Sequence, residues 1–277
     1  LTTGAERYMF YLTGGDGAGD NHLKNIVRLG GSASKLHLLL LLAAVNMDEQ
    51  ALTHLKALLE SMVYYSTVNQ IKTNELERLY AQCCKQIREI HTDEELTSFI
   101  NNKIKPTISQ WKVNNRSNFM RIGFDSMQQY RVKFILARIT KYVDVRRKNG
   151  GDASNVAEFY EGGIEIEHIM PQKYSAAYGI SEDDYNAAKQ RLGNLTLLEK
   201  TINASIGDDA FASKSEAYKQ SAYYLTRSIA QLDDVGQQTA INRMNQKLRS
   251  WSSWGPSMIE DRQAILYDLS EEIWSID

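Results

Sequence analysis

A histidine followed by two asparagines is the clearest chemical pattern in this sequence. His168 lies in the run EHIMPQ (residues 167–172), and Asn194 and Asn203 follow it, nine residues apart. An imidazole can take a proton from water, and an amide oxygen can bind a divalent cation. This order of residue types suits a phosphodiesterase that uses one metal ion and a histidine base. We therefore interpret the chain as a nuclease.

Two short strands and a helix are expected to position these residues. Residues 163–168 alternate isoleucine and glutamate as a short strand does, and Pro171 ends regular pairing. Residues 170–191 form an insert with helical content at 181–191, a second strand covers 194–198, and the helix that carries Asn203 follows directly. The predicted order is strand, insert, strand and helix, with His168 at the end of the first strand.

The same residues resemble a known family of nucleases. The EHIMPQ run, the LGNLTLL run (residues 192–198), Asn203, Phe211 and Lys214 together look like the C-terminal nuclease domain of GmrSD-like and SspE-like type IV, modification-dependent restriction enzymes. That domain belongs to the HNH, or ββα-metal, superfamily. The resemblance is strong over residues 164–221 and looser over 131–138 and 254–274. It implies a mainly α fold, in which a helical bundle surrounds a small ββα-metal (HNH) core.

The resemblance assigns roles to the three catalytic candidates. His168 is expected to act as the general base, whereas His22, His37, His54 and His91 lie in segments without a neighbouring ligand set. Asn203 is expected to bind Mg²⁺, with Mn²⁺ as a possible substitute, through its amide oxygen; capping of a helix is the alternative. Asn194 is expected to hold the backbone of the insert in place and so orient the base.

Glu167 stands where related domains carry a metal-binding acidic residue or histidine, so it is the second predicted ligand. Successive residues of a regular strand point to opposite faces, and Glu167 shares a phosphate with His168 only if the strand bends or ends there. Glu165 lies two residues earlier, on the same face as Glu167, and is the fallback ligand.

Basic residues give candidate contacts to the DNA backbone. Ser213 to Glu216 has the pattern of a capping box, which predicts Lys214 in the first turn of a helix, where free amides favour an anion. Residues 131–148 hold seven basic residues against one acidic residue. The predicted phosphate contacts in this stretch are Arg138, Arg146, Arg147 and Lys148; a solvated helix face is the alternative.

Composition sets limits on the rest of the chain. The protein has 277 residues, 43% hydrophobic content and a net charge of -2, which suits a globular protein of one or two cores. The longest apolar run, residues 38–45, is far shorter than the ~20 residues that cross a bilayer, so we expect a cytoplasmic protein. Cys83 and Cys84 are adjacent and are expected to be reduced.

Most of the remaining sequence is predicted to be helical. Apolar spacing indicates helices over 36–59 with a break near 46–48, then over 73–90, 93–105 and 126–143, after a glycine-rich loop at 14–19. Residues 147–155 are the best candidate boundary. We expect a helical region at 1–150, the nuclease core at 151–235 and a C-terminal helical cap at 236–277, in which Trp251, Trp254 and Trp274 are packing residues.

The expected function is metal-dependent hydrolysis of DNA, with one strand cut by one site. The resemblance implies phage or modified DNA as the substrate and a separate N-terminal domain that senses modification and handles nucleotide. We find no GxxxxGK[ST] loop and no initiator methionine, so the chain is expected to be a C-terminal fragment. Two alternatives stay open: a nuclease that cleaves RNA, and an idle helical interaction module.

Overall fold

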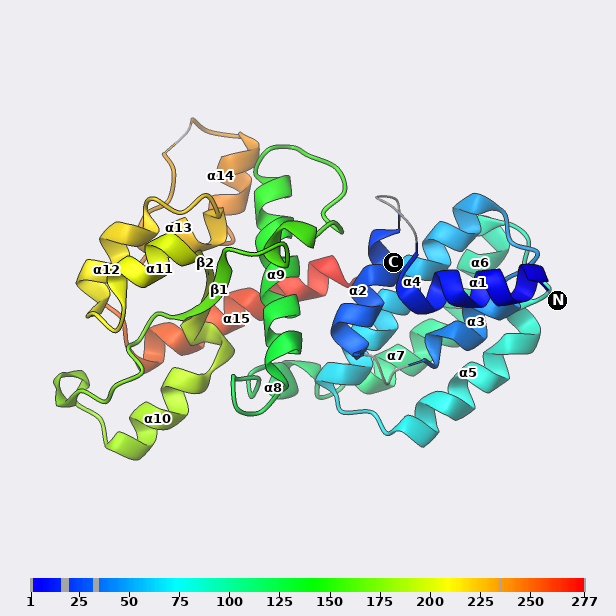
Figure 1. Cartoon of the computed structure of the whole chain (residues 1–277), viewed down its shortest axis with the longest axis horizontal. Helices are drawn as coiled ribbons and strands as arrows, with labels where there is room; N and C mark the ends of the chain where they lie inside the picture. Colours follow the sequence, from blue (N-terminus) through cyan, green and yellow to red (C-terminus); the bar gives the residue numbers. More distant parts are fainter. Residues whose placement is uncertain (1, 16–19, 32–34, 235, 277) are drawn as a thin grey trace. The chain divides into compact units, whose positions relative to one another are not determined.

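The computed structural model describes residues 2–15, 20–31, 35–234 and 236–276. The chain forms two compact units, which we call the N-terminal unit (Leu1–Phe119 with Trp274–Asp277) and the C-terminal unit (Met120–Ile273). The helices and strands of both units are labelled in Figure 1. The predicted glycine-rich loop includes Gly17 and Gly19, which lie outside the described residues.

The N-terminal unit is built from helices around α4. Its elements are α1 (Thr2–Thr13), α2 (Asn21–Gly30), α3 (His37–Ala43), α4 (Glu49–Val68), α5 (Thr73–Ile87), α6 (Asp93–Phe99), η1 (Ile100–Ile104), α7 (Lys105–Lys112) and α8 (Asn115–Phe119). α4 packs against α2, α3, α6, α7 and α8. The predicted break before α4 is confirmed: the Asp48 side chain accepts a hydrogen bond from the backbone amide of Ala51, which fixes the start of the helix.

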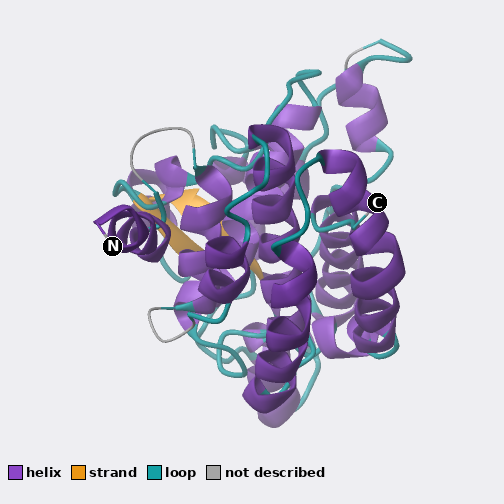
Figure 2. Cartoon of the chain, turned by 90° about the vertical axis from the view of Figure 1, so that its right-hand side faces the viewer, coloured by secondary structure: helices purple, strands orange, loops and turns teal. Residues whose placement is uncertain are grey.

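The C-terminal unit contains the two strands among helices. Its elements are α9 (Gln129–Arg146), η2 (Ala157–Phe159), β1 (Ile164–His168), η3 (Ala176–Tyr178), α10 (Glu182–Gln190), η4 (Leu192–Asn194), β2 (Leu195–Glu199), α11 (Lys200–Ile206), α12 (Phe211–Tyr218), α13 (Tyr224–Ala230), α14 (Ala240–Asn245) and α15 (Pro256–Ile273). The predicted order of strand, insert, strand and helix is confirmed. The fold as a whole is mainly helical, with one small sheet in the described residues (Figure 2).

β1 and β2 pair antiparallel over their whole length. Ile164 lies opposite Glu199, and His168 lies opposite Leu195 at the other end of the ladder. The backbone amide of Ile169 then donates to Asn194 O, so the chain stays fixed for one residue beyond β1. β1 therefore ends at a position where both its last side chain and the following loop are held.

α15 is docked closely against the turn that precedes β2. Arg262 Nη1 donates to the carbonyl oxygens of Gly193 (2.8 Å) and Leu195 (2.7 Å), and the Gly193 amide donates to Gln263 Oε1 at 3.1 Å. A Cβ on Gly193 would lie 2.0 Å from Ile259 O, a distance that no side chain tolerates. The glycine of the LGNLTLL run thus allows a helix to pack directly on the site's backbone.

A hydrophobic cluster packs around the end of β1 and against β2. It contains eleven buried residues from β2, the insert and four of the helices, with their connecting loops, and these are Ile169, Met170, Tyr185, Leu198, Ile206, Phe211, Tyr218, Ile229, Trp251, Trp254 and Ile259. Trp251 and Trp254 pack here as the sequence predicts. Trp274 is also buried, in the N-terminal unit, where its ring stacks on Tyr64.

The predicted domain boundaries stay a prediction, and the compact units divide the chain elsewhere. The units separate between Phe119 and Met120, so α9 belongs with the strands rather than with the N-terminal helices. α9 contacts both α13 and β2, and most of the residues in its middle are buried.

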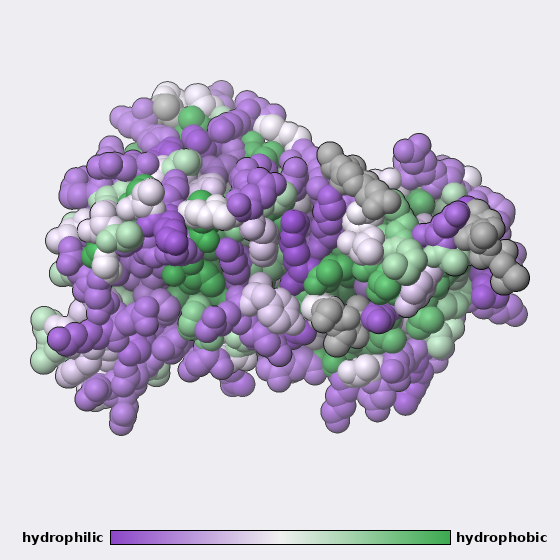
Figure 3. Space-filling model, viewed as in Figure 1, coloured by the Kyte–Doolittle hydropathy of each residue, from purple (hydrophilic) through white to green (hydrophobic). Residues whose placement is uncertain are grey.

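Polar side chains cover most of the visible surface in Figure 3, with smaller apolar patches between them. Among the described residues, no helix is both long enough and apolar enough to cross a membrane.

Candidate active site

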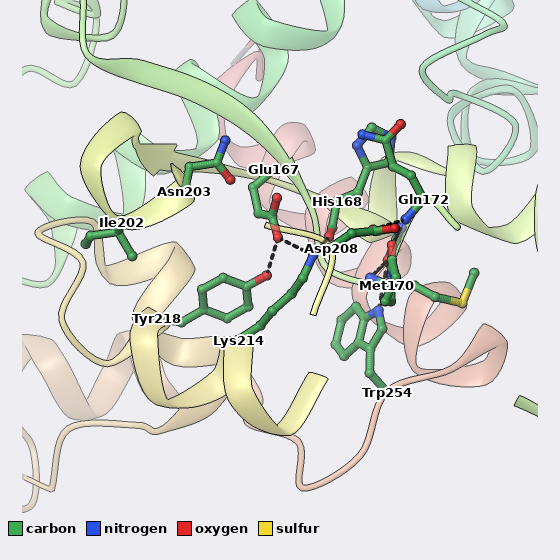
Figure 4. A network of polar contacts seen from close by, with 12 residues as sticks. Glu167, His168, Met170, Gln172, Ile202, Asn203, Asp208, Lys214, Tyr218 and Trp254 are labelled. Carbon is green, nitrogen blue, oxygen red and sulfur yellow. Dashed lines mark hydrogen bonds and ion pairs between the residues drawn. The ribbon is translucent and has the colours of Figure 1, made fainter. Parts of the chain in front are cut away.

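The two faces of β1 carry different parts of the site. Glu167 faces Lys214 and Tyr218, whose ammonium and hydroxyl groups lie 2.7 and 2.9 Å from its Oε1 (Figure 4). The ring of His168 instead packs edge-on against Phe124, with ring centroids 5.1 Å apart. Strand alternation therefore persists to the end of β1, and the two neighbouring side chains have different surroundings.

His168 is held as a neutral imidazole. Its side chain is buried, and its Nε2 atom has no hydrogen-bond partner among the described residues. Burial lowers the pKa of His168 to about 4; the positive charges of Lys214 and Lys189 act in the same direction, and Asp208 opposes them. A neutral ring with an unpartnered nitrogen can accept a proton at neutral pH.

Lys214 is a buried residue that ties Glu167 to the end of β1. Only 1% of it is exposed, and its Nζ donates to Glu167 Oε1 and to His168 O, both at 2.7 Å. Burial raises the pKa of Glu167, while Lys214 and Tyr218 oppose that shift by stabilising the carboxylate. Lys214 thus fixes the position of the backbone that carries His168.

This placement corrects the predicted start of the helix. α12 begins at Phe211 after Ala210, without a side-chain cap, so Ser213 to Glu216 lies inside the helix and forms no capping box. The helix thus starts two residues before the capping pattern, with Phe211 buried in the core as its first residue. The contact between Lys214 and DNA stays a prediction, and the described partners of its ammonium are internal.

Glu165 and Asn203 form the pair with the chemistry of a metal site. Asn203 Nδ2 donates to Glu165 Oε2 at 2.8 Å, and both residues are partly exposed. α11 packs on both strands and so brings Asn203 from the helix to the face of β1 that carries Glu165. Carboxylate and amide oxygens are the ligands that suit Mg²⁺.

The oxygen atoms of these side chains show which residues could hold a metal ion. Glu165 and Asn203 fit, because they are adjacent and reachable by solvent, whereas the Glu167 carboxylate is engaged by the Lys214 ammonium. Within the described residues, no three His, Cys, Asp or Glu side chains are grouped to hold a metal. A bound Mg²⁺ would therefore keep several waters, as this ion commonly does.

Asn194 makes the contacts expected of a brace for the insert. Its Oδ1 accepts from the Met170 amide at 2.7 Å, and its Nδ2 donates to Lys189 O at 2.9 Å and to Met170 O at 3.3 Å. Asn194 is fully buried. It therefore joins the two ends of the insert: Met170, two residues after His168, and Lys189, near the end of α10.

The basic residues of α9 divide into buried and exposed members. Arg138 is buried and donates to Ala153 O at 2.6 Å, and Arg147 contacts Asp144 at 3.2 Å. Arg146 and Lys148 are exposed at the end of the helix. The alternative of a solvated helix face does not hold for Arg138, because this side chain is buried in the middle of α9. The contacts of the other basic residues with DNA stay a prediction.

Comparison with known protein families decides the identity of this region. Residues 111–269 match the family described as GmrSD restriction endonucleases, C-terminal domain. The chain belongs to this family. A search of curated proteins found no match. Membership supports a restriction-endonuclease-type nuclease, with DNA as its substrate, and it agrees with the resemblance carried by the EHIMPQ and LGNLTLL runs.

Three further residues of this GmrSD-type domain were missed as parts of the site. Asp208 accepts from the amides of Gln172 (2.6 Å) and Lys173 (2.9 Å), Tyr218 donates to Glu167, and Trp254 Nε1 donates to Asn194 Oδ1 at 2.9 Å. Tyr218 and Trp254 were interpreted only as packing residues. The hydroxyl of Tyr218 and the indole N–H of Trp254 could have indicated these contacts, since a buried Tyr or Trp usually has a hydrogen-bond partner.

Proposed function

We propose that the chain is an HNH-type endonuclease domain that hydrolyses DNA phosphodiesters with His168 as general base. The observation that carries the proposal is the state of His168: a neutral imidazole at the end of β1, with an unpartnered Nε2. The antiparallel β1 and β2, followed by α11 with Asn203, support a ββα-metal core around it.

The chemical step starts with a water molecule beside the imidazole of His168. His168 takes a proton from this water, the oxygen attacks phosphorus, and the bond from phosphorus to the 3′ oxygen breaks. Asn194 and Lys214 act on this step indirectly: they hold the backbone on either side of His168 and so fix the ring against the attacking water. One such site cuts one strand, so we propose nicking.

Mg²⁺, or Mn²⁺ in its place, would be held by Asn203 with a carboxylate of β1. When bound, the ion stabilises negative charge on the phosphate and on the leaving oxygen. Glu165 is the carboxylate that fits best, because it already contacts Asn203. It lies three residues before His168, on the opposite face of β1, so one phosphate would reach both the ion and the base only around the end of the strand. Glu167 would serve only if it exchanged the Lys214 ammonium for the ion.

The biological setting follows from the family. We propose an effector domain of a cytoplasmic, modification-dependent system against phage DNA, which works with an N-terminal domain that senses modification and handles nucleotide. Restriction endonucleases are the proteins that the family description names.

A plasmid-nicking assay tests the proposal. The full chain is incubated with supercoiled plasmid, with Mg²⁺ or with a chelator, and with matched DNA and RNA oligonucleotides. We expect Mg²⁺-dependent conversion of supercoiled to open-circular plasmid and no RNA cleavage. Cleavage of RNA alone would replace the proposal by its RNA alternative, and cleavage of neither would support an idle module.

A further inference from the structure

A cavity of about 700 Å³ lies in the C-terminal unit beside the proposed site. One wall comes from the insert, with Pro171, Tyr174 and Tyr178, and the other from the start of α12 and the segment before α15, with Phe211 and Trp254. The volume falls within the roughly 300–1,000 Å³ of pockets that hold small organic ligands. The cavity is therefore large enough for one nucleotide.

The walls of the cavity are aromatic and rigidly held. The Phe211 and Trp254 rings are stacked, with centroids 5.5 Å apart, and Tyr174 and Tyr178 both pack edge-on against the buried Tyr185. Aromatic faces bind unstacked bases of any sequence, because every base has a π face. Tyr174 and Tyr178 are partly exposed, so their rings are reachable from the cavity.

Polar groups stand at the rim of this aromatic cavity. Lys173 supplies a cation suited to a phosphate, while Ser252, Ser253 and Asp208 supply hydroxyl and carboxylate groups for the edge of a base. All four of these residues are exposed. An apolar interior with a few polar groups at its edge is typical of sites that take a flipped base.

Two residues that line the cavity also make hydrogen bonds to the proposed site or to the loop that follows it. Trp254 forms a wall of the cavity and donates to Asn194, and Asp208 lines the cavity and holds the amides of Gln172 and Lys173. Pro171 follows His168 by three residues. The wall of the cavity therefore begins three residues after the proposed general base.

We propose that this cavity binds a single unstacked nucleobase of the strand that is cut, with Tyr178 as a stacking platform. The inference rests on the proposed function for the identity of the strand, but the base-binding step itself needs no cleavage. The occupant is a nucleobase because the walls offer stacking faces and the rim offers one cation for the neighbouring phosphate.

Binding measurements on the full chain carrying His168→Ala test this proposal without cleavage. The probes are the four deoxynucleoside monophosphates and, as a ligand without a base, deoxyribose 5-phosphate. We expect the nucleotides to bind and the sugar phosphate to bind far more weakly. Tyr178→Ala should weaken nucleotide binding by about 5- to 150-fold, as loss of one stacking partner does, while Tyr178→Phe should keep it.

A matched control and a DNA probe sharpen the test. Tyr130→Ala removes an exposed tyrosine of α9 and should leave nucleotide affinity unchanged. In a short duplex, one abasic position should weaken binding to the His168→Ala chain, and that penalty should vanish when Tyr178→Ala is added. Equal affinity for nucleotides and sugar phosphate, or an abasic penalty that survives Tyr178→Ala, would overturn the proposal.

These outcomes separate the cavity from the catalytic proposal. If plasmid nicking is absent but nucleotides bind in a Tyr178-dependent manner, the cavity stands and the nuclease mechanism fails. If nicking occurs and nucleotides do not bind, the mechanism stands and the cavity proposal fails.

Discussion

His168 is the residue that we propose as the general base. Burial and two lysines lower the pKa of its imidazole to about 4, so the ring is neutral, and the Lys214 and Asn194 contacts fix the backbone on both sides. A general base must be deprotonated and correctly placed, and His168 meets both conditions. A pKa of about 4 also makes the imidazole a weak base, since proton transfer is most efficient when the pKa lies near the working pH.

Metal titrations distinguish the two carboxylates of β1. Asn203→Ala and Glu165→Gln should each raise the Mg²⁺ concentration needed for half-maximal nicking by about tenfold or more, because each removes a proposed oxygen ligand. Glu167→Gln removes the partner of Lys214, so it should lower the rate without a comparable shift in metal requirement.

The measurement is the nicking rate against Mg²⁺ and Mn²⁺ concentration for these three variants. Partial rescue by raised metal is expected for Asn203→Ala and Glu165→Gln. A metal shift for Glu167→Gln and none for Glu165→Gln would make Glu167 the ligand and reject the assignment to Glu165.

His37 predicts a pH dependence of stability at the residue scale. It is buried in α3, its two ring nitrogens have no partner among the described residues, and burial lowers the pKa of His37 to about 4. The unfolded chain binds this proton near pH 6.5, so the neutral ring's contribution is complete above pH 6.5 and is lost as pH falls towards 4.

The expected loss is about 3 kcal/mol, from roughly 1.4 kcal/mol per pKa unit. Denaturant unfolding between pH 4 and 7 measures it, with His37→Leu as the comparison, since that variant lacks the titrating ring. The difference in unfolding free energy between the two proteins should vary with pH across this range. A constant difference would show that His37 is not buried as a neutral ring.

At the scale of elements, local sequence patterns predicted the strands and the helix of the site. The alternation at 164–168, Pro171 and the run before Asn203 reflect constraints between near neighbours. β1 and β2 were therefore expected within one residue of their bounds, and α11 was expected directly after β2. The Glu167 to Lys214 ion pair joins residues 47 positions apart, and no local pattern contains it.

The same limit explains two errors in the predicted helices. Residues 93–105 were predicted as one helix, but α6 ends at Phe99 and is followed by η1 and α7, with Pro106 in the first turn of α7, where a proline costs no hydrogen bond. Arg138 was read as a surface cation because basic residues flank it, but its neighbours in space bury it. Both outcomes depend on packing between elements, which spacing along the chain does not encode.

Gly193 makes the docking of α15 testable. Gly193→Ala places a methyl group 2.0 Å from Ile259 O, so α15 must move away from the turn before β2. We expect a loss of about 1–3 kcal/mol in stability together with reduced nicking, because the shift reaches Asn194.

Gly151→Ala is the matched control, since a Cβ there meets no atom within 4 Å, and its effect should stay within about 0.5 kcal/mol. Denaturant unfolding and nicking rates of both variants give the result. A Gly193→Ala protein as stable and active as the control would show that α15 is not packed on the turn.

At the scale of the whole molecule, the net charge of -2 gives no overall attraction to DNA, so DNA binding must depend on local positive regions. Arg146 and Lys148 are the exposed members of the predicted cluster. The double variant Arg146→Ala, Lys148→Ala should weaken binding to all DNA sequences alike and reduce the slope of log affinity against log salt by roughly one unit per lost phosphate contact.

Lys85→Ala with Arg88→Ala is a charge-matched control from the N-terminal unit, where both residues are exposed. Affinity is measured against salt concentration for wild type and both double variants. Equal slopes for all three proteins would place the DNA path away from the end of α9.

Plasmid nicking by matched histidine variants tests directly whether this chain cuts DNA with His168 as its base. His168→Ala should reduce the rate of plasmid nicking in Mg²⁺ by ~10²- to 10⁴-fold while melting temperature and DNA affinity stay close to wild type. His91→Ala, which alters an exposed histidine of the N-terminal unit, should nick at the wild-type rate. A His168→Ala protein that nicks plasmid as fast as wild type would show that His168 is not the general base.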